Sequence, residues 1–517
     1  MSDEQPIYRS AAKRVDHSQV AGDLGAPAPE SGDREKRAYR DGYRKLQPVD
    51  ASRRVAFDVI RQVNGDGAYA NIALAKALRN ARREHRGFDG RDAAFTTELV
   101  SGTLRQQGRL DFFLARHLSR PIEQIDPPVL DVMRLGAHQL LDMRVPDHAA
   151  VAQTVDLARE VLTAGPVGMV NAVLRALTRE TEQERDQAVA AIEDDTARLA
   201  VEHSHPEWIV TAFADALAAN GCDRDELPEL LAADNERPYV SLIARPGLLT
   251  RDELADEAED ILRTRVAFGE VSPYSVILES GDPSRLPSIR NMHAGAQDEG
   301  SQLAALVAAS APIDDGPDAR WLDLCAGPGG KAALLAALGA ESGARLTANE
   351  VHSHRARLVA RALEPFDNTE VVSGDGREFG GPGTEWPLAS FDRVVVDAPC
   401  TGLGSLRRRP ESRWRRSIDD LKDLVELQQG LLDRALQLTR PGGVLTYITC
   451  SPHVAETHQQ VARLLGNGGV ELLDARAIAR AESPSSIENP GEGLLQLWEH
   501  RNGTDLMFVA TLRRTLP

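Results

Sequence analysis

Beyond Ser301 the chain alternates short apolar runs with helical stretches, and this alternation restricts the possible folds more than any other feature of the sequence. Five runs occur in order: RWLDLC, RLTANE, EVVSGD, FDRVVVDAP and GVLTYITC. Each is followed by a turn rich in Gly, Pro or Ser or by a helical stretch, which is typical of a parallel sheet with helices on both faces. We therefore predict an α/β domain with a doubly wound sheet over 301–517. Its ligands should bind at the carboxyl ends of the strands.

The first three runs end in glycines and acidic residues. The first leads into CAGPGGK (325–331), where glycines allow a ligand to approach the backbone and the following helix offers free N–H groups. The second ends in Glu350, a carboxylate that can accept hydrogen bonds from both hydroxyls of a ribose, and the third leads into Gly-Asp375-Gly. Strand ends favour turn residues for structural reasons alone, which explains each feature singly. The series is better explained by a cofactor that carries adenosine.

The last two runs each end beside a cysteine. The fourth leads into Asp397-Ala-Pro-Cys400 and the fifth into Thr-Cys450-Ser-Pro. A cysteine at the end of a core strand is commonly a small buried hydrophobe, but here two lie at the edge where the cofactor is expected. A thiolate can add to carbon 6 of a pyrimidine and so activate carbon 5 toward an electrophilic methyl group. Asp397 could stabilise the charge that develops. Methylation of an amino group needs no thiol.

An arginine-rich segment, 405–416, lies between these two runs and contains six Arg and one Glu. Clustered arginine with an interposed aromatic residue is typical of a loop that binds RNA backbone and stacks on a base. A solvated loop would have the same composition. The RNA contacts predicted in this segment are Arg407, Arg408, Arg409, Arg413 and Trp414.

Upstream of the predicted sheet the sequence divides into four segments. Residues 1–48 are rich in Ser, Pro, Gly and mixed charge, and we expect a disordered tail. Over 49–180 apolar residues recur at helical spacing, which predicts an all-helical domain whose 17 arginines suit phosphate contact, although they also suit a solvated surface. We expect 181–235 to be an acidic helical linker and 236–300, which mixes β-rich runs with a helix, to be a small α+β subdomain.

The net charge of −18 argues against a nucleic-acid partner only if it is spread over the whole chain. Residues 181–300 contain 26 acidic and 10 basic side chains, whereas 51–180 contain 15 acidic and 18 basic ones. The acidity is therefore concentrated in one middle segment. We expect RNA to engage the helical domain and the arginine-rich segment and to avoid residues 181–300.

Cysteine spacing and hydropathy restrict metal content and location. The four cysteines, which include Cys222 and Cys325, form no CxxC pair, and this argues against a zinc site and a disulfide framework. No uninterrupted apolar stretch reaches the roughly 18 residues of a membrane span. We expect a cytoplasmic monomer with no membrane or metal partner.

Taken together, these motifs resemble those of the RsmB/Sun family of S-adenosylmethionine-dependent RNA (cytosine-5) methyltransferases, which implies a Rossmann-like fold for 301–517. The matching motifs are CAGPGGK, Glu350, Asp375, DAPCTG (397–402), RRRPESRW (407–414) and PGGVLTYITCS (441–451). Upstream, DAAFTTELVSGTLRQQGRLD (92–111) and VNAVLRAL (170–177) resemble a NusB-like RNA-binding domain. One departure concerns 241–245, which read SLIAR where family members commonly carry Arg-Val-Asn, so no function is carried over to that subdomain.

The resemblance implies roles for individual residues. Cys450 would attack carbon 6, Cys400 would assist release of the product, and Asp397 would lie near the reacting end of the cofactor. The implied contacts with S-adenosyl-L-methionine are Cys325, Ala326, Gly327, Pro328, Gly329, Gly330, Lys331, Glu350, Asp375 and Asp397. Spacing alone does not choose between the two cysteines, because DNA cytosine methyltransferases attack with a cysteine that follows proline.

The function expected from these residues is methyl transfer from S-adenosylmethionine to carbon 5 of a cytosine in structured RNA, with 16S rRNA as the substrate. A tRNA substrate is an alternative, as is a non-catalytic RNA-binding or assembly factor in which the α/β domain serves for docking. Methylation of a base amino group would usually require an Asn/Asp-Pro-Pro-aromatic sequence where this chain has DAPC (397–400), and it would leave Cys450 unexplained.

Overall fold

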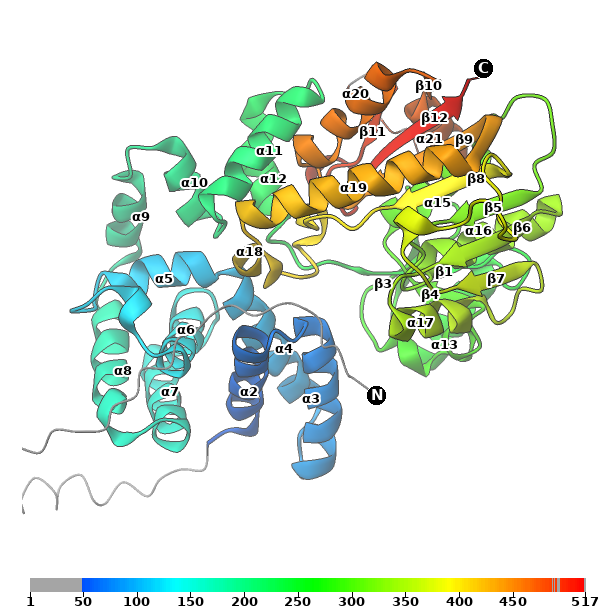
Figure 1. The fold of residues 1–517 in the computed structure, drawn as a ribbon. Coiled ribbons are helices and arrows are strands. Elements are labelled where there is room, and N and C mark those ends of the chain that lie inside the picture. Colours follow the sequence, from blue (N-terminus) through cyan, green and yellow to red (C-terminus); the bar gives the residue numbers. More distant parts are fainter. Residues whose placement is uncertain (1–48, 486, 488, 491–492, 516–517) are drawn as a thin grey trace, which may run out of the picture. The chain divides into compact units, whose positions relative to one another are not determined.

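The first part of the described chain is helical. The computed structural model describes residues 49–485, 487, 489–490 and 493–515, so the tail predicted over 1–48 lies outside the described residues (Figure 1). The helices are α2 (Ala51–Asp66), α3 (Ala70–Glu84), α4 (Gly90–Arg105), α5 (Gln107–Ala115), α6 (Pro127–Leu141), α7 (Asp147–Val161) and α8 (Ala164–Leu177). Ile60, Leu110 and Leu174 are fully buried in their common core. The apolar residues that recur at helical spacing thus line one core, which confirms the all-helical prediction.

Residues 181–235 are helical, as expected, but they are more than a linker. They form α9 (Glu182–Ala190), α10 (Asp195–Glu202), α11 (Glu207–Ala219) and α12 (Leu227–Ala233). Phe213 and Leu217 of α11 are fully buried in a core that also contains Leu403, Trp498 and Leu506. The apolar face of these helices therefore packs against the α/β part of the chain, which a count of acidic residues does not reveal.

A small antiparallel sheet precedes the main one. Its strand order is β2-β3-β1-β4. The elements are β1 (Val240–Ala244), α13 (Arg251–Leu262), β2 (Val266–Phe268), β3 (Ser275–Leu278), α14 (Pro287–Arg290) and β4 (Ala294–Ala296). Thr250 begins α13 through a capping box with Glu253, and Leu254 on the same helix packs against Leu242 and Val276 of the sheet. This segment has the mixed α+β structure expected of it.

The main sheet has eight strands among the described residues, in the order β10-β12-β9-β8-β5-β6-β7, with β11 paired to β12. The strands are β5 (Arg320–Asp323), β6 (Arg345–Asn349), β7 (Thr369–Val372), β8 (Phe391–Asp397), β9 (Thr439–Thr449), β10 (Val470–Leu473), β11 (Leu495–Gln496) and β12 (Phe508–Arg514). Strands β5 to β9 are parallel, and they are the five apolar runs of the sequence; β10, β11 and β12 are antiparallel.

Helices cover both faces of this sheet (Figure 1). The helices on its faces are α15 (Glu299–Ser310), α16 (Gly330–Ser342), α17 (Ser353–Leu363), α19 (Ile418–Leu438), α20 (His458–Asn467) and α21 (Ala475–Glu482). Two short helices, α18 (Ser412–Arg415) and α22 (Glu499–Asn502), contribute no residue to the two cores of the sheet. Trp321 of β5 packs in the core with α15 and α16, whereas its neighbour Leu322 packs in the core with α19 on the opposite face. The prediction of a doubly wound α/β domain is confirmed, and the carboxyl ends of the parallel strands share one edge.

Two kinds of feature are absent from the described part of the chain. No helix there is both long and apolar enough to span a bilayer. In the same residues, no three side chains of His, Cys, Asp or Glu are grouped in a way that could hold a metal ion.

Candidate active site

The two strand-end cysteines lie side by side. Cys400 follows β8 and Cys450 follows β9, and because these strands are parallel neighbours, their carboxyl ends meet. The Sγ atoms are 3.4 Å apart, and both thiols are free. The Gly404 N–H supports this arrangement by donating to the Cys450 carbonyl oxygen at 2.9 Å. A Cβ on Gly404 would lie 2.3 Å from the Leu506 carbonyl oxygen, so only glycine fits there.

The two thiols differ in acidity. A hydrogen bond from Cys400 has the largest effect on Cys450 and lowers the pKa of that thiol. Burial and the charge of Asp397 oppose this shift, while the positive charges of Lys331 and Arg409 add to it. The same sulfur–sulfur hydrogen bond, together with burial, raises the pKa of Cys400 well above its usual range. Cys450 is therefore the thiol that ionises first, and the thiolate is the reactive form.

An ion pair lies beside the thiols. Lys331 Nζ donates to Asp397 Oδ2 at 2.9 Å. Lys331 is in the first turn of α16, directly after the glycine loop, and Asp397 is the last residue of β8. The ion pair therefore connects the glycine loop to the end of β8. Burial disfavours the ammonium form of Lys331, but Asp397 outweighs it and raises the pKa of the lysine. Lys331 is thus a cation that stabilises the Cys450 thiolate.

The glycine loop folds against the end of β6. Glu350 follows this strand and is 3% exposed. Its Oε1 accepts a hydrogen bond from the His352 N–H at 2.9 Å, and its Oε2 lies 3.5 Å from an Arg355 nitrogen. A Cβ on Gly327 would lie 2.0 Å from Glu350 Oε2, so the loop can approach the carboxylate this closely only with glycine at that position.

Two buried acceptor atoms at this edge have no hydrogen-bond partner among the described residues. They are Asp323 Oδ2 at the end of β5 and Asn349 Oδ1 at the end of β6. Burial and then the charge of Asp397 raise the pKa of Asp323 to about 7. Asp375 lies after β7, where it accepts from the Arg377 N–H at 2.9 Å. Unsatisfied buried acceptors of this kind fit a ligand that brings hydrogen-bond donors.

Sequence analysis missed Asp323 and Glu456. Asp323 has a visible signal, since it is an acid inside the apolar run RWLDLC. Glu456 has none, because two of its three partner residues, Thr401 and Gln428, are 55 and 28 residues away in the chain. Its carboxylate is fully buried and accepts four hydrogen bonds. The donors are Thr401 N at 2.8 Å, Gln428 Nε2 at 3.0 Å, Thr401 Oγ1 at 2.5 Å and Ser451 Oγ at 2.6 Å.

Comparisons with known proteins agree with this geometry. Residues 311–513 match the model of the family described as 16S rRNA methyltransferase RsmB/F, and residues 50–179 match the NusB family. Ribosomal RNA small subunit methyltransferase B of Pseudomonas putida (strain KT2440) is 32% identical over 82% of this chain and 91% of its own length. The chain belongs to the RsmB/F family of methyltransferases. As an RsmB/F-family protein it is an RNA methyltransferase that depends on S-adenosylmethionine.

Two further relatives cover nearly the whole RsmB/F-family chain. A Mycobacterium tuberculosis (strain H37Rv) protein, whose name refers to a methyltransferase without a substrate, is 47% identical over 91% of this chain and 98% of its own. The crystal structure of PH0851 has a TM-score of 0.72 at 21% identity and covers 90% of this chain and 98% of its own. The latter likeness concerns the fold alone.

The edge of the sheet fits S-adenosylmethionine. The predicted ribose contact, Glu350, lies at this edge, and the unpartnered Asp323 and Asn349 oxygens could accept hydrogen bonds from the amino groups of a bound cofactor. Cys325 to Gly329 form the turn between β5 and α16, next to Glu350. When bound, the cofactor supplies an electrophilic methyl group on a sulfonium. Asp375, another predicted cofactor contact, lies one strand farther along the same edge.

Most arginines of the segment 405–416 bind the protein itself. Arg413 is fully buried and donates to the Asp234 carbonyl oxygen at 2.8 Å and to Asn235 Oδ1 at 2.7 Å. Arg407 is buried 3.6 Å from Glu499. Burial in these contacts removes both guanidinium groups from solvent, which contradicts the prediction that Arg407 and Arg413 contact RNA.

The remaining predicted RNA contacts differ from one another. Arg408 is held by the carboxylates of Asp298 and Asp505, which corrects its predicted RNA role, and Trp414 is half-buried against the backbone of α5. Arg409 is exposed, and its guanidinium has no hydrogen bond or ion pair with the described residues. Its guanidinium lies 5.3 Å from the centroid of the exposed Tyr69 ring. Arg409 is therefore the one predicted arginine that faces solvent.

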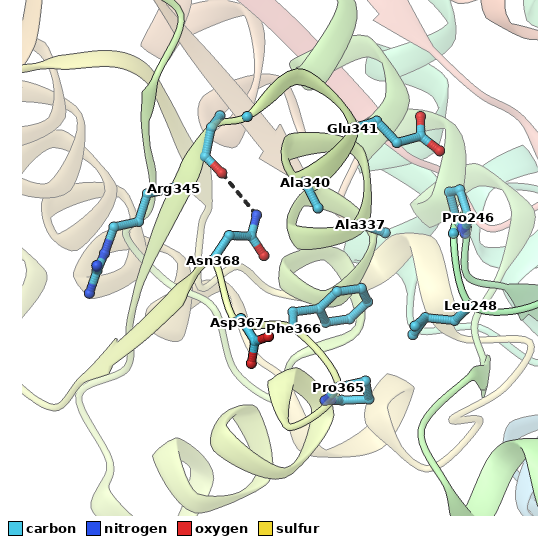
Figure 2. Close-up of a pocket in the computed structure, with 13 residues that line it drawn as sticks. Pro246, Leu248, Ala337, Ala340, Glu341, Arg345, Pro365, Phe366, Asp367 and Asn368 are labelled. Atoms are coloured by element: carbon cyan, nitrogen blue, oxygen red, sulfur yellow. Dashed lines mark hydrogen bonds between the residues drawn. The ribbon is translucent and has the colours of Figure 1, made fainter.

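A cavity of about 530 Å³ lies away from the cysteines (Figure 2). It is lined by residues at the end of α16 and α17, by Pro246 to Leu248, and by Arg345 and Asn368. Because Arg345 begins β6 and Asn368 precedes β7, this cavity is at the amino ends of the strands. It is therefore separate from the edge that carries the chemistry of the RsmB/F-family protein.

Proposed function

We propose that this chain transfers the methyl group of S-adenosylmethionine to carbon 5 of a cytosine in 16S rRNA, through a covalent bond between Cys450 Sγ and carbon 6. The observation that carries this proposal is the pair of thiols, 3.4 Å apart, beside the Lys331–Asp397 ion pair at the cofactor edge. A nucleophilic thiol is needed because carbon 5 of a cytosine is a poor nucleophile until carbon 6 has been attacked.

The sulfur atoms account for both the formation and the breakage of the adduct. The Cys450 thiolate adds to carbon 6, and the electron pair of the double bond moves to carbon 5, which takes the methyl group from the sulfonium. A base then removes the carbon 5 proton, the double bond re-forms, and the carbon–sulfur bond breaks to return the thiolate. The Cys400 thiol donates a hydrogen bond to Cys450 Sγ and so stabilises the departing thiolate.

Asp397 supports the choice of cytosine. Lys331 binds Oδ2 of this carboxylate, and among the described residues it is the only hydrogen-bond donor to Asp397. The other oxygen can accept from the exocyclic amine of a cytosine, which uracil lacks. As charge develops on the ring during thiolate addition, this fixed ion pair stabilises the transition state.

The protein's own effect on cellular RNA tests the proposal. We expect one 5-methylcytosine in 16S rRNA to be present with the protein and lost without it, measured by bisulfite sequencing. The purified protein should restore that position with tritiated S-adenosylmethionine. Loss of a 5-methylcytosine from tRNA alone would support the tRNA alternative. An unchanged RNA pattern, with no cofactor binding by calorimetry, would favour the assembly factor.

Substitution of Arg409 or Tyr69 should weaken RNA binding. Arg409 contributes to the acidity of Cys450 and is stacked on Tyr69, so this exposed pair lies on the approach to the thiols. Removal of one stacking ring in Tyr69→Ala should lower RNA affinity by on the order of tenfold. Arg409→Ala should also reduce the slope of log affinity against log salt by about 1, as measured by filter binding. Arg265→Ala, which removes a highly exposed arginine from the acidic segment, is the control and should change neither quantity.

A further inference from the structure

Glu456 joins the two loops that carry the cysteines. Thr401 follows Cys400 in the chain and Ser451 follows Cys450, and both hydroxyls donate to the same carboxylate oxygen, Glu456 Oε2. The two hydroxyl oxygens are themselves only 2.9 Å apart. A single buried side chain thus fixes the residue next to each sulfur atom.

Further hydrogen bonds hold this carboxylate in place. Gln428 of α19 donates from one amide nitrogen to Glu456 Oε1 at 3.0 Å and to the Pro399 carbonyl oxygen at 2.9 Å. The Tyr447 hydroxyl of β9 donates to the Glu456 carbonyl oxygen at 2.6 Å. Strand, helix and both cysteine loops therefore meet at one glutamate, so a shift of its side chain would change the distance between the thiols.

The environment of Glu456 is unusual for a purely structural acid. The side chain is fully buried, and no Lys, Arg or His of the described residues forms an ion pair with it. A buried carboxylate held only by neutral donors is costly compared with an amide of the same shape. Its negative charge lies near Cys400, where it is one of the causes that raise the pKa of this thiol, after the Cys450 hydrogen bond, burial and the charge of Cys450.

We propose that Glu456 is a positioning residue that makes the two cysteines unequal: its carboxylate holds the sulfur atoms at hydrogen-bond distance, and its charge keeps Cys400 a thiol while Cys450 acts as the thiolate. This inference rests on the proposed function for its catalytic consequence, but the inequality of the thiols is a property of the protein alone. The charged groups that face the sulfur atoms are Lys331, Arg409 and Asp397 around Cys450, and Glu456 beside Cys400.

Thiol alkylation of the full chain tests the inference without RNA or cofactor. Iodoacetamide should modify Cys450 of the unaltered protein faster than Cys400, as measured by peptide mass spectrometry over a series of pH values. Glu456→Gln keeps the size of the side chain and removes the charge. In this variant Cys400 should ionise at lower pH, and the ratio of the two alkylation rates at neutral pH should fall by on the order of tenfold, which corresponds to one pKa unit.

Methylation kinetics provide the second readout. Glu456→Gln should lower kcat by on the order of tenfold or more, with little change in KM for RNA or for S-adenosylmethionine, because the residue touches neither. Glu426→Gln, which removes an exposed carboxylate from the same helix as Gln428, is the matched control and should behave like the unaltered protein. Glu456→Ala would leave four hydrogen-bond donors unpaired and can unfold the domain. The test therefore uses Glu456→Gln, whose melting temperature shows whether it is folded.

The outcomes separate the two proposals. Equal alkylation ratios in the unaltered protein and a folded Glu456→Gln variant would overturn the role of Glu456, whatever the activity. If Glu456→Gln changes the ratio of the two alkylation rates but the unaltered protein methylates no RNA, the role of Glu456 in making the thiols unequal stands and the proposed function is rejected. An unchanged kcat in the variant would also overturn the positioning role.

Discussion

Cys450→Ala should abolish methyl transfer, with a loss of more than about 10³-fold in kcat, because the variant lacks the sulfur that is proposed to bond to carbon 6. The hydrogen bond from Cys400 and the positive charge of Lys331 lower the pKa of Cys450, which favours its thiolate. Binding of S-adenosylmethionine should persist within about twofold, since Cys450 follows β9 and is not among the predicted cofactor contacts. Transfer of tritiated methyl to RNA measures the first quantity, and calorimetry measures the second.

Cys222→Ala is the control for this experiment. Cys222 is also free and buried, but it packs with helices α11 and α12 and not beside the strand-end cysteines. It should retain activity at temperatures where the protein remains folded. Full methylation by Cys450→Ala would refute attack by Cys450. If Cys450→Ala is active while Cys400→Ala is inactive and forms no adduct, Cys400 is the attacking thiol.

The site could be predicted from the sequence where the chemistry follows from the strand pattern. The five apolar runs end in glycines, acids and cysteines, and parallel strands bring their carboxyl ends to one edge. For this reason Glu350, Asp397 and the two cysteines lie along one edge of the sheet, although Glu350 and Cys450 are 100 residues apart in the chain. Glu456 could not be found in this way, since it follows no strand directly and acts through contacts with Thr401 and Ser451.

The arginine-rich segment shows why composition alone misleads. Six arginines and one glutamate predict an RNA-binding loop, but the partner of an arginine depends on what folds against it. Asp234, 179 residues earlier, accepts from Arg413, and Asp298 pairs with Arg408. Buried charges are stable in proteins when paired. Part of the acidity of residues 181–300 therefore serves to bind this segment, which a sum of charges cannot show.

In the proposed mechanism, the Cys400 thiol acts mainly after the methyl group has been transferred. Its hydrogen bond to Cys450 Sγ, at 3.4 Å, would stabilise the thiolate both before attack and as the carbon–sulfur bond breaks. Removing the donor raises the pKa of Cys450, so the acidic limb of the pH–rate profile for adduct formation should move to higher pH. At a pH where attack still occurs, the variant lacks the group that favours departure of the thiolate.

Cys400→Ala should therefore trap the protein on its RNA. With S-adenosylmethionine and RNA present, we expect a covalent complex that survives denaturing electrophoresis and carries the transferred methyl group, while turnover falls by on the order of 100-fold, the scale of a lost proton-donating group. The double variant Cys400→Ala/Cys450→Ala should give no complex, because the attacking sulfur is absent. A Cys400→Ala protein that turns over normally would show that the neighbouring thiol has no part in release, and that the 3.4 Å contact serves only the acidity of Cys450.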